Sequence, residues 1–200
     1  MRKALLIVSV AVFGLSFGGG EQAVSTFTDK RDGKIYRIVE IGGQTWFAEN
    51  LNYAAKGSVC YDNKAANCAK YGRLYDWETA MKACPAGYNL PSDDEWDVLV
   101  DYAGGEETAG TKLKSAAGWD KDGNGTNDFG FSVLPGGFGH SEDSFIGAGR
   151  LGFWWSATED DAFGARSRDM YYYDEDMRWY SHYKTSLFSV RCVQNKEGEQ

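Results

Sequence analysis

The spacing of apolar positions predicts a β-ribbon near the start of the chain and a helix after it. Between residues 34 and 47, apolar and polar residues alternate on either side of Gly42 and Gly43, which is the pattern of a β-hairpin. From residue 74, apolar residues recur every three or four positions as far as Cys84. This spacing predicts an amphipathic helix over residues 74–84, which Pro85 ends because proline offers no amide hydrogen.

A second helix has a clear start signal. Ser92 and Glu95 form a capping box, and apolar residues follow at helical spacing as far as Ala103. Acidic residues suit the first turn of a helix, so structural capping explains them better than acid catalysis. Glycine is frequent after residue 104, and short stretches typical of strands recur. These stretches cover residues 129–134, 152–158, 167–173, 178–183 and 187–193.

The first 20 residues have the layout of a secretory signal peptide. Arg2 and Lys3 precede an apolar run from Ala4 to Phe17, and glycines follow. The run is shorter than the roughly 20 residues that a membrane-spanning helix needs, which favours a cleaved signal over an anchor. We expect residues 21–27 to be a short linker, 28–195 a single domain and 196–200 a polar tail. The mature chain would then be exported to the cell surface, the medium or the periplasm, with no transmembrane segment.

The composition of the chain argues against nucleic acid as its binding partner. The chain has 200 residues, a formal net charge of −8 and 15% aromatic residues. The aromatic content argues against disorder, and the acidic surface would repel the phosphates of a nucleic acid. We therefore expect a folded domain that does not bind nucleic acid.

Four cysteines suggest disulfides, because an exported domain folds in an oxidising compartment. Cys60, Cys68, Cys84 and Cys192 allow three pairings, and spacing alone does not choose among them. Pairing Cys60 with Cys68 would close a short loop and leave Cys84 to join Cys192, near the end of the fold. A zinc site is disfavoured because paired C-x-x-C units are missing and both histidines are distant in the sequence.

Several segments, in order, resemble the Fibrobacter succinogenes major paralogous domain family over roughly residues 26–195. They are TDKRDGK at 28–34, IGGQTWFAENLNY at 41–53, YGRLY at 71–75, CPAG at 84–87, LPS at 90–92, FGFS at 129–132, LPGG at 134–137, WSATE at 155–159 and SVRCV at 189–193. The resemblance implies an α+β, C-type-lectin-like fold of the variant found in formylglycine-generating enzymes. Such a fold has two main helices, a twisted antiparallel sheet, glycine-rich loops and chain ends that lie close together.

One loop matches half of a calcium-binding pattern. Asp120, Asp122 and Asn124 alternate with other residues before Gly125, but Phe131 stands where the pattern needs a glutamate. Bound calcium would therefore need Asp128 or distant ligands. A glycine-rich turn is the alternative, since tight turns select the same residue types. We expect no other cofactor.

Aromatic residues are concentrated between residues 153 and 183. Side chains alternate faces along a strand, so about half of these rings should enter the core. The others could form a platform for a glycan or a protein. The candidate binding residues are Trp154, Tyr172, Trp179, Tyr180 and Tyr183.

Candidate catalytic groups are few. His140 and His182 are the only histidines, and neither lies in a motif with a serine or cysteine nucleophile. We therefore expect a secreted or surface-displayed, non-catalytic binding module for a glycan or protein; the sequence does not indicate its oligomeric state. The alternative is an enzyme, either on a formylglycine-generating scaffold or as a glycosidase that uses two carboxylates among Glu159, Asp160 and Asp161.

Overall fold

The computed structural model describes residues 25–141 and 143–196. The expected signal peptide lies outside these ranges, as do residues 21–24 of the linker and 197–200 of the tail. Strand β1 (Thr26–Thr28) begins within the expected linker. The Phe27 ring packs against Phe47 and Tyr88, with ring centroids 5.6 and 4.8 Å apart. The domain therefore starts before the expected boundary at residue 28.

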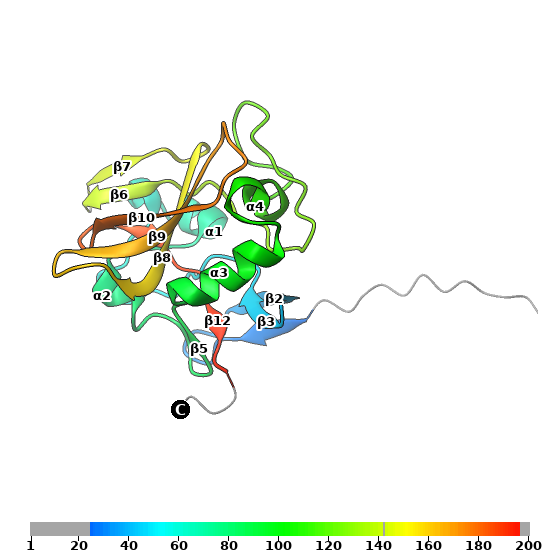
Figure 1. The fold of residues 1–200 in the computed structure, drawn as a ribbon. Helices are drawn as coiled ribbons and strands as arrows, with labels where there is room; N and C mark the ends of the chain where they lie inside the picture. The colour runs from blue at the N-terminus through cyan, green and yellow to red at the C-terminus, as the bar shows by residue number, and fades with distance from the viewer. Residues whose placement is uncertain (1–24, 142, 197–200) are drawn as a thin grey trace, which may run out of the picture.

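The described strands form two five-stranded sheets and a separate hairpin. The first sheet has the order β1-β2-β3-β12-β5 and contains β2 (Ile35–Ile41), β3 (Gln44–Phe47), β5 (Tyr88–Asn89) and β12 (Val193–Gln194). Its pairs are antiparallel. The predicted hairpin is confirmed as β2 and β3, joined at Gly42 and Gly43, which both have positive φ. Because β1 and β12 share this sheet, the two ends of the fold lie close together (Figure 1).

The second sheet has the order β10-β9-β8-β11-β4. It contains β4 (Leu74–Tyr75), β8 (Leu151–Glu159), β9 (Gly164–Tyr171), β10 (Arg178–Tyr183) and β11 (Phe188–Ser189). Its pairs are antiparallel except β11 with β8. Strands β6 (Phe138–Ser141) and β7 (Ser144–Ile146) form the hairpin. The fold is therefore α+β, with the antiparallel pairing divided between two main sheets.

Helix α3 (Asp93–Tyr102) holds the two sheets together. Its capping box is confirmed, since Ser92 Oγ accepts from the Glu95 amide and Glu95 Oε2 accepts from the Ser92 amide. Trp96 of α3 packs against Trp46 of β3, with ring centroids 4.8 Å apart, and donates its indole N–H to the Trp155 carbonyl of β8. In Figure 1, α3 runs between β8–β10 on one side and β3, β5 and β12 on the other.

The helix predicted over residues 74–84 is wrong for much of its length. Leu74 and Tyr75 form β4, and α2 spans only Trp77–Ala80. Asp76 starts this short helix by accepting a hydrogen bond from the Thr79 amide at 2.7 Å.

Two of the expected strands also differ from the structure. The stretch at 187–193 divides into β11 and β12, which belong to different sheets. Residues 129–134 form no regular strand, because Gly130 and Ser132 have φ of 71° and 55°. Asn127 Oδ1 accepts the Ser132 N–H and holds this irregular segment. The strands predicted at 152–158, 167–173 and 178–183 correspond to β8, β9 and β10.

Two helices were not predicted, α1 (Ala65–Tyr71) and α4 (Glu106–Leu113); a 3-10 turn, η1 (Tyr61–Asn63), precedes α1. Neither helix has a side-chain cap at its N-terminus, so the usual start signal is missing. Helix α4 also contains Gly110, which lowers its helix propensity. A Cβ at Gly110 would lie 2.4 Å from the Glu175 carbonyl oxygen. This glycine therefore lets the turn after β9 pack closely on α4.

Strand β8 is buried on both faces, so the second sheet lies between two hydrophobic clusters. Trp154 faces the cluster that contains Leu99 and Met170. Its neighbours Phe153 and Trp155 face the opposite cluster. The alternation of faces along a strand explains why adjacent rings enter different cores.

Candidate functional site

The outer part of the second sheet carries a hollow of about 600 Å³ that combines aromatic rings with polar groups. We call it the aromatic groove. Both histidines of the chain line it, together with Asp161. Phe163, at its rim, is 76% exposed. Its aromatic lining is Phe138, Phe153, Phe163, Tyr171, Tyr183 and Phe188.

The ring of His182 is held by packing and by a hydrogen bond. The rings of Phe153 and Phe188 meet it edge to face, with centroids 5.6 and 5.0 Å away. Its Nε2 lies 3.0 Å from Oδ2 of Asp169, whose other oxygen accepts a hydrogen bond from Ser167 Oγ at 2.5 Å. Asp169 is 1% exposed, and this burial raises the pKa of its carboxyl group. A buried acid therefore orients a half-exposed imidazole.

Sequence reasoning missed Asp169. The pairing of β9 with β10 brings it to His182, although the two residues are 13 positions apart in the chain. No local motif records this contact. One sequence feature could have suggested part of this arrangement. Side chains alternate faces along β9, so Ser167 and Asp169 lie on the same face of the strand.

A second hollow of about 340 Å³ adjoins the groove. We call it the acidic hollow. Tyr171 lines both spaces, and the hydrogen bond between Asp169 and His182 connects them. The acidic hollow is lined by Asp169, Tyr171, Tyr173, Asp174, Asp176, Arg178 and Tyr180.

The five expected platform residues do not form one surface. Trp154 is fully buried and donates its indole N–H to Asn50 Oδ1, so the expectation that it presents a ring to a ligand is wrong. Tyr180 lines the acidic hollow and Tyr183 lines the aromatic groove.

The other two expected residues lie elsewhere. Trp179 is opposite Arg168 in β9, and the guanidinium of Arg166 lies 4.4 Å from its ring centroid, on the face that carries α3. Tyr172 is half-buried against the cluster of Leu99 and Met170. Strand alternation therefore separates Trp179 from Tyr180, its neighbour in sequence.

Ion pairs fasten β9 to the start of α3. Arg168, which is fully buried, places Nη2 2.7 Å from Oδ1 of Asp93 and 2.6 Å from Oδ1 of Asp97. Arg166 Nη1 lies 2.7 Å from the other Asp93 oxygen. Asp93 lies in the first turn of α3. It also accepts charge-assisted hydrogen bonds from two arginines. These contacts fix the sheet behind the groove.

The half-matched calcium loop folds as a turn. Asn124 Oδ1 accepts the Trp119 amide hydrogen at 3.0 Å, and Lys121 and Asp122 both have positive φ. Within residues 25–141 and 143–196, no three histidine, cysteine, aspartate or glutamate side chains are grouped as metal ligands. Asp120, Asp122 and Asp128 are exposed. Calcium binding at this loop stays a prediction.

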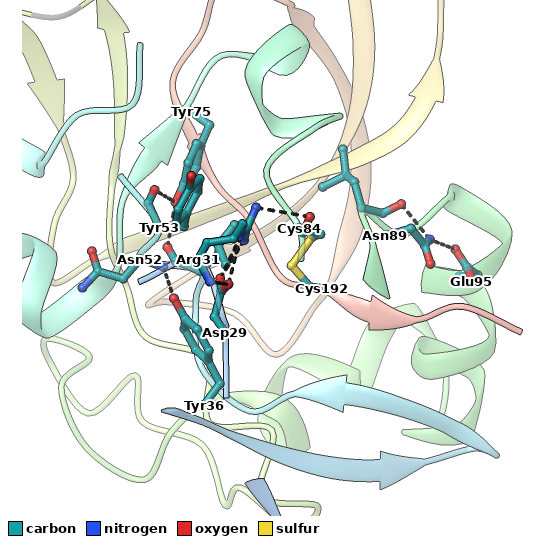
Figure 2. Close-up of a disulfide and its surroundings, with 12 residues drawn as sticks. Asp29, Arg31, Tyr36, Asn52, Tyr53, Tyr75, Cys84, Asn89, Glu95 and Cys192 are labelled. Carbon is teal, nitrogen blue, oxygen red and sulfur yellow. Dashed lines mark hydrogen bonds and ion pairs between the residues drawn. A yellow bond between two sulfur atoms is a disulfide. The ribbon is translucent and has the colours of Figure 1, made fainter. Parts of the chain in front are cut away.

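The cysteines pair as Cys60 with Cys68 and Cys84 with Cys192, so the structure selects one of the three pairings that the sequence allowed. The second bond joins the turn after α2 to the residue before β12. Figure 2 shows Arg31 beside it, with Nη1 3.5 Å from the Cys84 carbonyl oxygen and a further ion pair to Asp29. The disulfide therefore brings together segments from near the start and near the end of the described fold.

The family model described as the Fibrobacter succinogenes major domain matches residues 39–194, which include both hollows and both disulfides. The chain belongs to this family. No curated protein and no solved structure matches it. In the described part of this major domain, no helix has the length and apolar character needed to cross a membrane.

Four segments of the major domain meet at a buried hydrogen-bond centre. Asn50 Oδ1 accepts from Trp154 Nε1 at 2.9 Å and from Arg191 Nη2 at 3.0 Å. Arg191 also donates to the carbonyl oxygens of Phe47 and Phe131. Burial lowers the pKa of Arg191 to about 9. Among the described residues this guanidinium forms no ion pair with a carboxylate; amide and carbonyl oxygens accept its hydrogen bonds, and its Cζ lies 4.5 Å from the centroid of the Phe131 ring.

A third hollow, of about 580 Å³, lies beside this centre and is lined in part by Asn50, Tyr71 and Arg191. The Asn50 amide donates to the Tyr71 carbonyl and to Ser189 Oγ, so its donors, like those of Arg191, serve the fold. The aromatic groove instead offers exposed rings and a half-exposed imidazole. We therefore take the groove as the candidate functional site of the major domain.

Proposed function

We propose that this major domain is an exported, non-catalytic binding module of C-type-lectin-like type that holds a glycan in the aromatic groove. One observation carries the proposal: exposed rings and fixed polar groups line the same concave surface. Its volume of about 600 Å³ is within the range of roughly 300–1,000 Å³ found for small-ligand sites.

The lining suits a sugar. Ring faces such as that of Phe163 can pack on the apolar C–H face of a pyranose. Hydroxyl groups can then exchange hydrogen bonds with the histidines and with Tyr171. A glycan is favoured over a protein because these polar groups are interleaved with rings inside a hollow, whereas a protein partner needs about 800 Å² of surface on each side. Two disulfides support export, since such bonds persist in oxidising compartments.

The Asp169–His182 pair is the one observation that favours an enzyme instead, because an acid that orients an imidazole is a component of hydrolytic sites. Among the described residues, no serine or threonine hydroxyl is hydrogen-bonded to His182. All four cysteines are in disulfides, which leaves no thiol for formylglycine-type chemistry.

The three acids considered for glycosidase chemistry have structural partners. Glu159 pairs with Lys184, and Asp160 lies 3.9 Å from Arg166. Asp161 accepts the backbone N–H groups of the next turn, and these bonds lower its pKa, whereas a general acid needs a raised pKa. The contacts of these three acids therefore favour a non-catalytic binding module over a glycosidase.

A glycan array tests the proposal. The purified protein should bind a defined set of glycans, and Phe163→Ala should weaken that binding by about tenfold, or ~1.4 kcal/mol. Trp179→Ala is the matched control, because Trp179 is also exposed but lies on the opposite face of β10. Absence of glycan binding, or equal losses in the two variants, would contradict the proposal.

A further inference from the structure

We propose that the acidic hollow binds an organic ammonium group, so that the glycan recognised by this domain carries free amino groups. This inference rests on the proposed function and deepens it, because the hollow adjoins the aromatic groove at Tyr171. The two spaces would hold neighbouring parts of one ligand.

Three tyrosine rings supply the first part of the recognition. The rings of Tyr171 and Tyr173 stack, with centroids 5.5 Å apart and planes 20° apart, and Tyr180 lines the same hollow from β10. A cation within about 6 Å of such a ring face is attracted by the negative charge of the π-system. Several rings around one small space therefore favour a cationic group.

Three carboxylates supply the second part of the recognition, and one of them, Asp174, forms no ion pair with a described residue. Asp176 pairs with Arg178 at 2.5 Å, and Asp169 is bonded to His182. Asp174 has no ion-pair partner among the described residues, and its Oδ1 is buried without a hydrogen bond. Because no ion pair neutralises this carboxylate, a positively charged donor that enters the hollow is attracted to it. An ammonium N–H is such a donor, and its charge matches that of the carboxylate.

Other ligand classes fit this lining less well. The carboxylates repel anions, and a neutral hydroxyl brings no positive charge to Asp174. The carboxylates of Asp169, Asp174 and Asp176 are not grouped closely enough to hold a metal ion in the part of the chain that the structure describes. A space of about 340 Å³ suits a bulkier organic cation.

The hollow is held in shape from behind. Lys114 is buried, and its ammonium group donates to the carbonyl oxygens of Tyr171 and Asp174 at 2.7 and 2.5 Å. The Met177 amide donates to the Glu106 carbonyl of α4. Gly110 lets this turn approach α4, since any Cβ there would overlap the Glu175 carbonyl. The site is therefore preformed, and little conformational entropy would be lost when the ligand binds.

Isothermal titration with two matched probes tests the inference: a chitosan hexamer with protonated amines, and the fully N-acetylated hexamer. We expect the chitosan hexamer to bind at least about tenfold more tightly, a difference of ~1.4 kcal/mol. Asp174→Asn, which removes the charge but keeps the shape, should abolish this preference. Asp101→Asn is the control, because Asp101 is an exposed acid on α3; it should change either affinity by less than about twofold, or ~0.4 kcal/mol.

The outcomes separate this inference from the proposed function. Equal binding of both hexamers, or an unchanged preference in Asp174→Asn, overturns the ammonium subsite and leaves the glycan module standing. A neutral glycan as the strongest array ligand does the same. Failure of the array and of both hexamers removes the proposed function itself.

Discussion

Opening the Cys84–Cys192 disulfide should destabilise the domain far more than opening Cys60–Cys68. The two bonds join residues 108 and 8 positions apart. In the chain-entropy description, a crosslink removes freedom from the unfolded chain in proportion to the logarithm of loop length. That relation gives about 4.8 kcal/mol for the long loop and about 2.5 kcal/mol for the short one. The expected difference in the free energy of unfolding is therefore about 2 kcal/mol.

Double alanine variants make the comparison fair, because each removes both sulfurs of one bond and leaves no unpaired thiol. Each pair contains one buried cysteine, Cys192 or Cys68, so the packing losses are similar. Urea unfolding followed by the fluorescence of the buried tryptophans measures both free energies. Equal losses, or a larger loss from the short loop, would refute the view that the long crosslink is the main covalent restraint on this fold.

Three further predictions concern the core. Arg191→Met should lower the free energy of unfolding by about 3 kcal/mol or more, because the buried carbonyl oxygens of Phe47 and Phe131 lose their guanidinium donors and Asn50 Oδ1 keeps only its bond from Trp154. Gly72→Ala should cost more than Gly33→Ala by about 1–3 kcal/mol: both glycines have positive φ, but only at Gly72 does a Cβ meet the Asn50 Cβ, at 2.8 Å. Tyr36→Phe should reduce the loss of stability in alkali, because burial raises the pKa of Tyr36 to about 12 from 10.0. This tyrosine contributes stability that is complete below pH 10 and disappears as the pH rises through about 12.

Chemical denaturation measures all three effects. A small cost of Arg191→Met would show that the guanidinium is not needed to satisfy its neighbours. Equal costs at the two glycines would mean that backbone conformation, and not the contact with Asn50, sets the penalty. An alkaline stability profile that is identical in Tyr36→Phe would contradict the burial argument.

Local signals in the sequence predicted those parts of the fold whose causes are local. The β2–β3 hairpin needed two glycines with positive φ, and α3 needed its capping box; both are visible in a few adjacent residues. Helix α4 was missed because its cap is a glycine and Gly110 interrupts its pattern. The reason for Gly110 is the turn at residues 174–176, which is distant in sequence and comes close only in the folded chain.

The candidate site was harder to predict for the same reason. The sequence indicated aromatic residues in β8–β10 but could not assign each ring to a face without the strand register. Trp154 and Trp179 were therefore expected to lie on the same binding surface as Tyr180. In the structure Trp154 is buried and Trp179 lies on the face that carries α3. The Asp169–His182 contact depends on the pairing of two strands, and the unpaired Asp174 oxygen depends on the packing of a turn.

Nuclear magnetic resonance of the protein titrated with its strongest array glycan locates the binding surface. We predict shifts for the side-chain resonances of His182, Phe163 and Tyr171, and an unchanged indole N–H signal from Trp179. Shifts at Trp179 without shifts at His182 would place the ligand on the opposite face of the sheet and contradict a glycan site in the aromatic groove.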